Sequence, residues 1–495
     1  MGRKIPMWQI GLVMLFVLLC LCYALDIFGM VFGERFSCGY AELHIPLIIS
    51  AVVASIVAIA NGWKWGFLEQ GIIQSISRSM QSCLILLTVG ILIGVWKAGG
   101  VIPGMIFYGL KIISPGIFLI TACILCGIVA LAIGSSWSVA GTVGVAMIGI
   151  AIGLGINPAV AAGAVVSGSY FGDKMSPLSD TTNLAPAVAG SNLFDHIKHM
   201  VWTVTPSMLI ALTIYGILGM GKGGDNVDLG IAGVLADEIN AEFAISPILL
   251  IAPILLIAIV VLKVPALPGL IGGIIIGLLF MGVMQGIPVN EWFGIMHYGY
   301  SSVSEVALND DYTVADLLGG GGMDSMLWTV NLILCAMTFG GIMDCTGMLG
   351  SLAEALLKIA KNTGLLVTIT VFSCFFVNII ASDQYLAIIL PGRMYKEAFE
   401  DRKLKGKNLS RCLEDSGTIT SALVPWNTCG AAMTRMLGVP TLQYAPYAFL
   451  NWMNPLVSIF YGFTGISMEK MSDEEYEAIL AQRKMDAELA AKSLD

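Results

Sequence analysis

Residues 172–183 read GDKMSPLSDTTN, a polar stretch set between apolar segments of the chain. A plain helix cannot continue through Pro177, because proline lacks the backbone N–H that a helix interior needs. Apolar runs of roughly 20 residues, the length of a helix that crosses a bilayer, recur along the whole chain. Inside a bilayer, backbone that is not helical is tolerated only where it packs against protein or lines a cavity. We therefore expect a membrane helix that is interrupted at this stretch.

The composition is that of a membrane protein. Of the 495 residues, 57% are hydrophobic and only 12% are charged, whereas a soluble domain has roughly 25% charged residues. Runs such as 10–25 and 248–261 are too long and too uniformly apolar for the ~10-residue alternating strands of a β-barrel. The expected fold class is therefore an all-α polytopic membrane protein. The net charge of −9 comes with no basic patch, so no nucleic-acid partner is expected.

Basic residues predict the orientation. Arg3 and Lys4 precede an apolar run that is longer than the ~7–15-residue core of a signal peptide. We therefore expect a first transmembrane helix whose N-terminus lies in the cytoplasm, because lysine and arginine concentrate on that side. The basic segment 396–411 is expected on the same side.

The chain divides into four expected parts. These are an N-terminal membrane half (1–220) with a polar cluster at 134–183, a polar connector (221–245), a C-terminal membrane half (246–464) with a polar cluster at 381–430, and a charged, helical cytoplasmic tail (465–495).

The two polar clusters occupy corresponding places in the two halves. Ser135 precedes Asp173 by 38 residues, and Ser382 precedes Asp415 by 33 residues. Interrupted polar segments at matching places are typical of the binding site of a secondary transporter. Carbonyl groups freed by unwinding can coordinate a cation, and the N-termini of half-helices can hold an anion.

These motifs resemble a known family. The stretch at 172–183 resembles the signature of the NhaC-type sodium/proton antiporter family, and SDQY at 382–385, LEDSGT at 413–418 and PWNTCG at 425–430 are similar to its C-terminal signatures. The resemblance implies inverted repeats, re-entrant hairpins, a scaffold beside a moving transport part, a bacterial or archaeal cytoplasmic membrane, and a homodimer. It also implies Na⁺/H⁺ antiport, although some similar proteins exchange malate for lactate.

Candidate ion ligands follow from the cost of a charge inside the membrane, at least ~2.5 kcal/mol. Four carboxylates qualify, with Asp180 the first choice to bind sodium and carry a proton; hydroxyl and amide oxygens add hard ligands for a small cation. The full set of candidates is Asp173, Asp180, Asp383, Asp415, Ser135, Ser136, Thr181, Thr182, Asn183, Asn427 and Thr428, with Asp180, Thr181 and Asn183 as the sodium ligands.

Structural roles compete with these assignments. Asp173 and Lys174 are adjacent and could form an ion pair, while Asp180 and Asp383 could each cap the helix that follows. Glu414 is expected at the surface.

The expected function is exchange of Na⁺ for H⁺ at a shared carboxylate site, with no enzymatic activity and no cofactor. The rival is a sodium-coupled exchanger or symporter of small organic anions or amino acids, which Arg393 or Arg435 in the site would favour. A channel and an intramembrane enzyme are further alternatives; the sequence shows no nucleophile–base pair and no HExxH motif.

Overall fold

The computed structural model describes residues 2–33, 37, 42–220, 229–262, 264–309 and 312–492. Within these ranges the regular structure is helical, apart from three isolated β-bridges. Eight of the described helices are long and apolar enough to cross a membrane, and a pair bent by 97° (Gly230–Glu242 and Pro247–Ile259) would make a ninth span. The expected all-α polytopic membrane fold is confirmed.

The helices of the first half are α1 (Met7–Ala24), α2 (Ile27–Phe32), α3 (His44–Ala60), α4 (Trp65–Ala98), α5 (Val101–Ile112), α6 (Pro115–Ile133), α7 (Ser136–Val139), the π-helical turn η2 (Ala140–Gly144), α8 (Val145–Gly153), α9 (Pro158–Met175), α10 (Asp180–Ala189) and α11 (Leu193–Met220). Those that follow are α12 (Leu229–Glu242), α13 (Ile251–Val261), α14 (Ala266–Val283), α15 (Val289–Tyr298) and α16 (Val314–Leu318). The last group is α17 (Leu327–Cys345), α18 (Met348–Leu357), α19 (Thr363–Ile380), α20 (Gln384–Glu400), α21 (Gly406–Leu413), the π-helical turn η5 (Glu414–Thr418), α22 (Thr428–Leu437), α23 (Thr441–Tyr444), α24 (Phe449–Thr464) and α25 (Asp473–Lys492).

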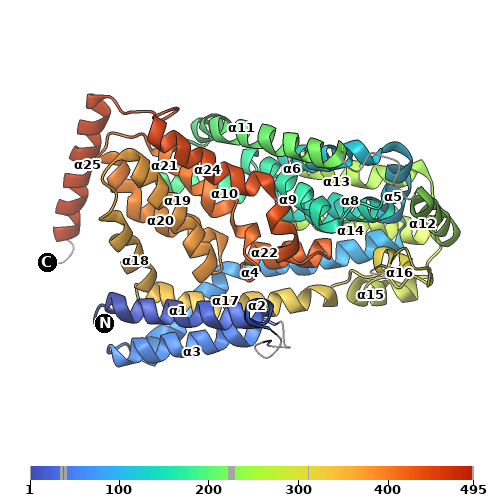
Figure 1. Cartoon of the computed structure of the whole chain (residues 1–495), viewed down its shortest axis with the longest axis horizontal. Helices are drawn as coiled ribbons and strands as arrows, with labels where there is room; N and C mark the ends of the chain where they lie inside the picture. Colours follow the sequence, from blue (N-terminus) through green and yellow to red (C-terminus); the bar gives the residue numbers. More distant parts are fainter. Residues whose placement is uncertain are drawn as a thin grey trace.

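The helices form two groups that mix the halves of the chain. In one, α1 packs on α3, and α17 packs on both α3 and α4; in the other, α6 packs along α9, and α24 packs on α11 and α19 (Figure 1). Each group thus contains helices from before and after the connector. Residues 221–228 of that connector lie outside the described residues, and the rest of it contains α12.

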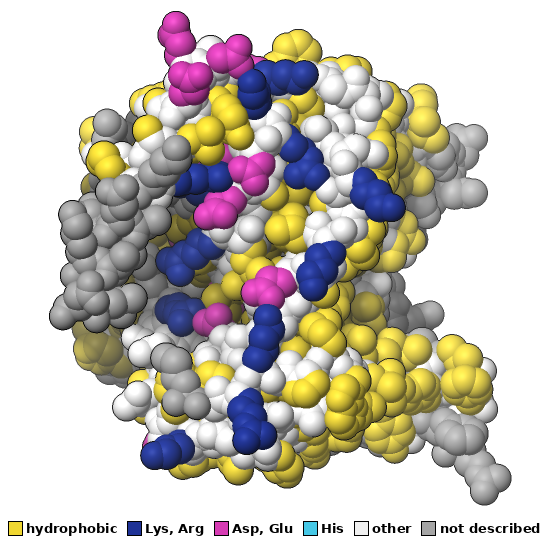
Figure 2. All heavy atoms as spheres, turned by 90° about the vertical axis from the view of Figure 1, so that its left-hand side faces the viewer, with side chains coloured by type: hydrophobic (Ala, Val, Ile, Leu, Met, Phe, Trp, Pro, Cys, Tyr) yellow, Lys and Arg dark blue, Asp and Glu magenta, His cyan; other side chains and the backbone are white. Residues whose placement is uncertain are grey.

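Both termini and the basic segment lie at one end of the molecule. In Figure 1 the chain ends, α18 and α25 are at the left, whereas α5, α12, α15 and α16 are at the right. The N-terminal Lys4 pairs with Glu354 of α18 at 2.6 Å. Figure 2 shows lysine and arginine side chains spread over this left-hand face. Because such residues concentrate on the cytoplasmic side, this is the end of the multi-pass membrane protein that is expected to face the cytoplasm.

The tail is tied to that end. Residue 404 forms a β-bridge with residue 470, and three lysines of the basic segment pair with acids of the tail, Lys403 with Asp473 at 2.6 Å, for example. The expected helix of the tail is present as α25. Its residues 493–495 lie outside the described part.

Four helices begin at breaks inside the apolar part of the chain. Chain direction changes at Gly134 and Ser382, which have left-handed backbone angles (φ 72° and 57°), and again before α10 and α22. The expectation of interrupted helices in both polar clusters is confirmed.

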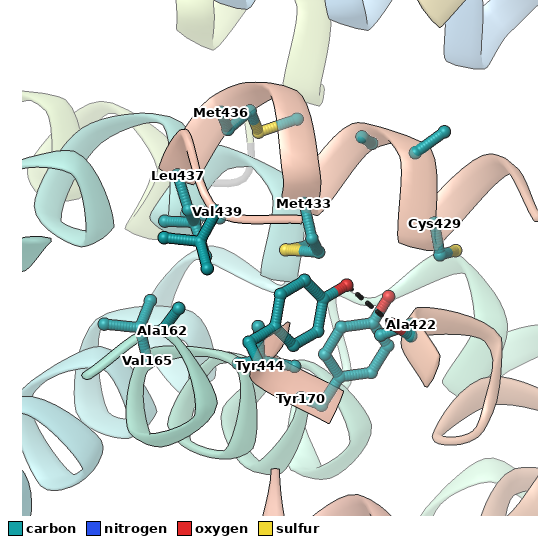
Figure 3. Packing of buried hydrophobic residues seen from close by; sticks show 14 of the residues in the cluster. Ala162, Val165, Tyr170, Ala422, Cys429, Met433, Met436, Leu437, Val439 and Tyr444 are labelled. Atoms are coloured by element: carbon teal, nitrogen blue, oxygen red, sulfur yellow. Dashed lines mark hydrogen bonds between the residues drawn. The ribbon is translucent and has the colours of Figure 1, made fainter. Parts of the chain in front are cut away.

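A buried apolar contact joins the two halves behind these breaks (Figure 3). In Figure 3, Ala162, Val165 and Tyr170 of α9 lie opposite Met433 and Leu437 of α22, and the Tyr444 hydroxyl donates to the Ala422 carbonyl at 2.6 Å. The labelled side chains are buried. α9 packs directly on α23, which packs on α22, so close packing joins α9 to the segment that contains both helices.

Candidate functional site

The first turns of the four helices that begin at breaks line one cavity of about 190 Å³. The four helices contribute Ser136 and Trp137 (α7), Asp180 (α10), Gln384 and Tyr385 (α20), and Thr428 and Cys429 (α22). Much of the remaining wall comes from Asp173 of α9 and from Gln81, Ser82 and Ile85 of α4. A helix N-terminus carries about half a positive charge. The cavity therefore combines positive helix ends with two carboxylates.

Asp173 is held by the helix that begins after Gly134. Its Oδ2 accepts hydrogen bonds from the Ser136 N–H at 3.0 Å and the Ser136 hydroxyl at 2.7 Å. Ser135 caps the same helix, since its hydroxyl oxygen accepts from the Ser138 N–H at 3.2 Å. Asp173 Oδ1 is buried without a described hydrogen-bond partner. One oxygen is thus positioned by protein and the other is left available.

Asp180 joins the two halves of the chain. Its Oδ1 accepts from the Thr181 N–H at 2.8 Å, and its Oδ2 accepts from the Tyr385 hydroxyl of α20. Unlike Asp173, Asp180 is solvent-exposed. It stands at the start of α10, whose ten residues run about 15 Å toward the basic cytoplasmic segment. A carboxylate at that depth is exposed because it faces the cavity.

Asp383 caps a helix, the structural role that competed with ion binding. Its Oδ1 accepts from the Leu386 N–H at 2.8 Å, and its side chain is buried outside the cavity. The next two residues, Gln384 and Tyr385, face the cavity instead. A cap side chain turns back toward its own helix, so the neighbouring residues of the first turn occupy the wall.

Asn427 has a similar role at the start of α22. Its Oδ1 accepts from the Cys429 N–H at 3.0 Å, and its amide donates to the Asn378 side chain at 3.0 Å. Thr428 follows it and lines the cavity. Gln384 is fixed from this helix as well, because its Oε1 accepts from the Cys429 thiol at 2.5 Å.

Asp415 lies in a separate buried network. Its Oδ1 is bonded by Lys174 Nζ, by Thr203 Oγ1 at 2.9 Å and by Asn454 Nδ2 at 2.7 Å, and Arg411 Nε is 3.8 Å from Oδ2. Lys174, Arg411 and Asp415 are fully buried. The ion pair of Lys174 is therefore made with Asp415 rather than with the adjacent Asp173, and Asp415 does not line the cavity.

The surface position expected for Glu414 is wrong. Glu414 is fully buried in the turn η5, and neither carboxyl oxygen has a described hydrogen-bond partner. The basic segment that precedes it ends on α21, which folds into the protein and carries Glu414 with it.

The other candidates on α10 stabilise its start. Thr182 Oγ1 donates to the Lys174 carbonyl at 3.0 Å, and the Asn183 amide donates to the Ser179 carbonyl at 2.6 Å. Thr181 Oγ1 lies 3.1 Å from Ser179 Oγ. Of the three sodium ligands suggested by the sequence, only Asp180 faces the cavity.

The structure thus brings together five of the candidates and adds residues that sequence reasoning missed. The five are Ser135, Ser136, Asp173, Asp180 and Thr428, and the additions include Gln81, Ser82, Trp137, Gln384, Tyr385 and Cys429. Gln384 and Tyr385 belong to the motif at 382–385, so a signal for them existed. Gln81 and Ser82 sit in a polar part of α4 that has no membrane-like hydropathy of its own.

The two arginines considered as anion ligands lie elsewhere. Arg393 is exposed on α20 and lines neither this cavity nor the larger one described below. Arg435 lies nearer the opposite end of α22 and lines the larger cavity.

Comparison with known proteins places the chain among transporters. The model of the Na⁺/H⁺ antiporter family matches residues 168–466. The Na⁺/H⁺ antiporter NhaC of Alkalihalophilus pseudofirmus is 37% identical, over 87% of this chain and 92% of the relative. The malate-2H⁺/Na⁺-lactate antiporter of Bacillus subtilis is 34% identical, over 86% and 89%. The arginine/ornithine antiporter ArcD of Halobacterium salinarum is 33% identical, over 88% and 89%.

Proposed function

Because the chain belongs to the Na⁺/H⁺ antiporter family, we propose that it exchanges Na⁺ for H⁺ at the cavity that Asp173 and Asp180 share. The observation that carries this assignment is the pair of carboxylates facing one small cavity where four helices begin. A small hard cation suits oxygen ligands of this type.

Exchange follows from competition between the two ions. Two carboxylates near each other favour binding of a positive charge, and either a sodium ion or a proton supplies it. A sodium ion takes oxygens of Asp173 and Asp180, with the hydroxyl and amide oxygens of the wall as further ligands. A proton on either carboxylate removes one of the two negative charges that hold the sodium ion, so proton binding weakens sodium binding and favours its release.

The helix breaks place helix N-termini and hydrogen-bond donors next to the two carboxylates. Helix N-termini stabilise ionised carboxylates nearby, and the Ser136 donors fix one oxygen of Asp173. If only the ion-loaded forms change the side to which the cavity opens, inward movement of protons drives sodium out. Such exchange breaks no covalent bond, so it uses neither enzyme chemistry nor a cofactor.

Transport in proteoliposomes tests the proposal. The full chain is reconstituted, a pH gradient is imposed, and Na⁺ is added without any organic solute. Collapse of the gradient by Na⁺, with saturation, is the expected result. A gradient that survives Na⁺ and collapses only when an organic solute is present would contradict it.

A second candidate is exchange of a small organic anion with sodium. Four helix N-termini around one cavity favour a negative group there, and one relative is named a malate-2H⁺/Na⁺-lactate antiporter. The volume argues against it, since about 190 Å³ is below the ~300–1,000 Å³ of common small-molecule sites. Uptake of labelled malate or lactate under a sodium gradient, in the same proteoliposomes, separates the two functions.

A homodimer is part of the proposal only through the family resemblance. Cross-linking of the protein in native membranes tests it, with a single monomeric band as the contrary result.

A further inference from the structure

A larger cavity, of about 450 Å³, lies away from the candidate cation site. Its walls come from α4, α8, the loop between α15 and α17, and the C-terminal end of α22. We call it the outer cavity, because α15 and α16 lie at the end of the molecule opposite the cytoplasmic one (Figure 1).

The two cavities follow the same two helices. On α4, Ile85 lines the cation cavity and Lys97 lines the outer cavity, a separation of about 18 Å along a helix. On α22, Thr428 lines the first and Arg435 the second. The outer cavity is therefore displaced from the cation site toward the outside.

The described lining of the outer cavity carries two cations and two acids. Lys97 is 7% exposed, and its Nζ donates to the Gly319 carbonyl. Arg435 donates through Nε to the Ser325 carbonyl, which leaves its other N–H groups without a described protein acceptor. The acids are Asp316 and Asp324. Neither Arg435 nor Asp324 forms an ion pair with another described residue.

Asp316 and Asp324 differ in how free their carboxylates are to bind a ligand. Asp316 Oδ2 accepts from the Thr313 hydroxyl at 2.7 Å and the Thr313 N–H at 2.8 Å. These hydrogen bonds, with the charge of Lys97, lower the pKa of Asp316 below its usual value, so it is ionised at neutral pH. Asp324 lies at the rim and is exposed. It is the acid that is open to a ligand.

A glycine run builds the rim between these charges. Gly320 and Gly321 line the cavity with positive φ, and a Cβ on Gly321 would lie 2.4 Å from the Gly94 backbone nitrogen. A side chain at Gly321 would require the backbone to move, and at Gly320 the positive φ disfavours one. The rim is thus shaped by close backbone packing.

We propose that the outer cavity binds a zwitterionic amino acid, with its carboxylate on Arg435 and its ammonium group on Asp324. The two positive and two negative side chains of the lining favour a zwitterionic ligand. A dicarboxylate would also face the two acids, and a bare cation would also face Lys97 and Arg435, whereas a dipolar ligand meets an opposite charge at each end. The volume is within the range of small-molecule sites, and Ile148, Ile152 and Leu437 offer an apolar wall to a side chain.

Binding to the purified full chain tests the inference. L-leucine is compared with 3-methylbutylamine, which lacks the carboxylate, and 4-methylpentanoate, which lacks the amine, by isothermal titration calorimetry; the other common L-amino acids follow as a panel. An amino acid should bind, and each analogue of leucine should bind at least about tenfold more weakly, the usual cost of one charged hydrogen bond.

Two variants identify the ends of the ligand. Arg435→Gln should weaken amino-acid binding at least about tenfold and leave 3-methylbutylamine unaffected, because that analogue has no carboxylate. Asp324→Asn should show the reverse pattern, leaving 4-methylpentanoate unaffected. Arg393→Gln, an exposed arginine on α20, is the matched control and should bind as the unmodified chain does.

The inference is overturned if no common L-amino acid binds, if the analogues bind as tightly as leucine, or if Arg435→Gln binds like the control. It is independent of the proposed sodium exchange. Elution in size-exclusion chromatography shows whether each variant is folded. Na⁺-dependent proton flux, measured on the same preparations without amino acids, shows separately whether exchange itself holds.

Discussion

The Tyr385 hydroxyl donates a hydrogen bond to Oδ2 of Asp180, a residue 205 positions earlier in the chain. Asp180 opens α10 in the first polar cluster, and Tyr385 lies in the first turn of α20 in the second. The cavity therefore exists only when both clusters are folded together. Motion of α20 relative to α10 would change the environment of the carboxylate, which links conformation to ion binding.

Replacing Asp180 should abolish exchange. Asp180→Asn keeps a side-chain oxygen that can accept from the Thr181 N–H but removes the charge that attracts Na⁺ and H⁺. We expect no Na⁺-dependent proton flux from a protein that elutes as the unmodified chain does in size-exclusion chromatography. Glu69→Gln, an exposed acid on α4, is the control. Full flux in Asp180→Asn would remove Asp180 from the site.

Removing one donor to Asp173 should weaken sodium binding. Ser136→Ala deletes the hydroxyl at 2.7 Å and keeps the backbone N–H. A hydrogen bond to a charged group contributes about 1.5–3 kcal/mol, so the Na⁺ concentration for half-maximal flux should rise about tenfold or more. Ser138→Ala, whose hydroxyl donates to Ser135 instead, should change it little. Equal values for the two variants would mean that Asp173 does not bind the ion.

Breaking the buried pair of Lys174 and Asp415 should destabilise the protein. Removing one partner of such a pair costs about 3–5 kcal/mol, because the other charge remains buried. Lys174→Met should therefore lower the midpoint of thermal unfolding in detergent, and Asp415→Asn in the same chain should restore part of it. Lys198→Met, on an exposed lysine of α11, is the control. An unchanged midpoint in Lys174→Met would contradict the network.

The cytoplasmic tail should detach in acid. The hydrogen bond from Lys407 holds the pKa of Glu469 below its ordinary value of 4.5, and the hydrogen bond from Lys403 holds the pKa of Asp473 below 3.8. A group with a lowered pKa stabilises the folded state above its ordinary pKa, and this contribution is lost as the pH falls through the folded-state value.

Hydrogen exchange of α25 should thus show full protection at neutral pH and declining protection below about pH 4.5, after correction for the intrinsic rate. In Lys407→Gln and Lys403→Gln the protection at neutral pH should already be lower. Protection that does not change between pH 7 and pH 3.5 would show that these ion pairs do not hold the tail.

The positions of the helix breaks could be predicted from the sequence more accurately than the residues that line the cavity. Pro177 and the polar clusters exclude plain helices whatever the tertiary structure, so their places could be predicted. The extent of α4 could not: the apolar run begins near Cys83, but the helix begins at Trp65. The N-terminal part of α4 is too polar to be predicted as a membrane helix from its hydropathy. It is helical in the structure, where α17 packs along α4.

The direction of a side chain could not be predicted where two neighbouring residues could each face the cavity or two partners were possible. Asp383 and Tyr385 are two positions apart, and only the backbone direction at the helix start decides which faces the cavity. Likewise Lys174 follows Asp173 directly, yet helical geometry points neighbours away from each other and the lysine finds Asp415 instead. Such choices depend on contacts between distant segments, which residue types alone do not specify.

The distance along the chain between Lys174 and Asp415, 241 positions, has a consequence for biogenesis. At roughly 5–20 residues per second the ribosome reaches Asp415 about 12–50 s after Lys174. Until then Lys174, in the last turn of α9, cannot pair with Asp415, and an unpaired charge inside the membrane costs at least about 2.5 kcal/mol. We therefore expect α9 to reach its final position only after the second half of the chain has been made.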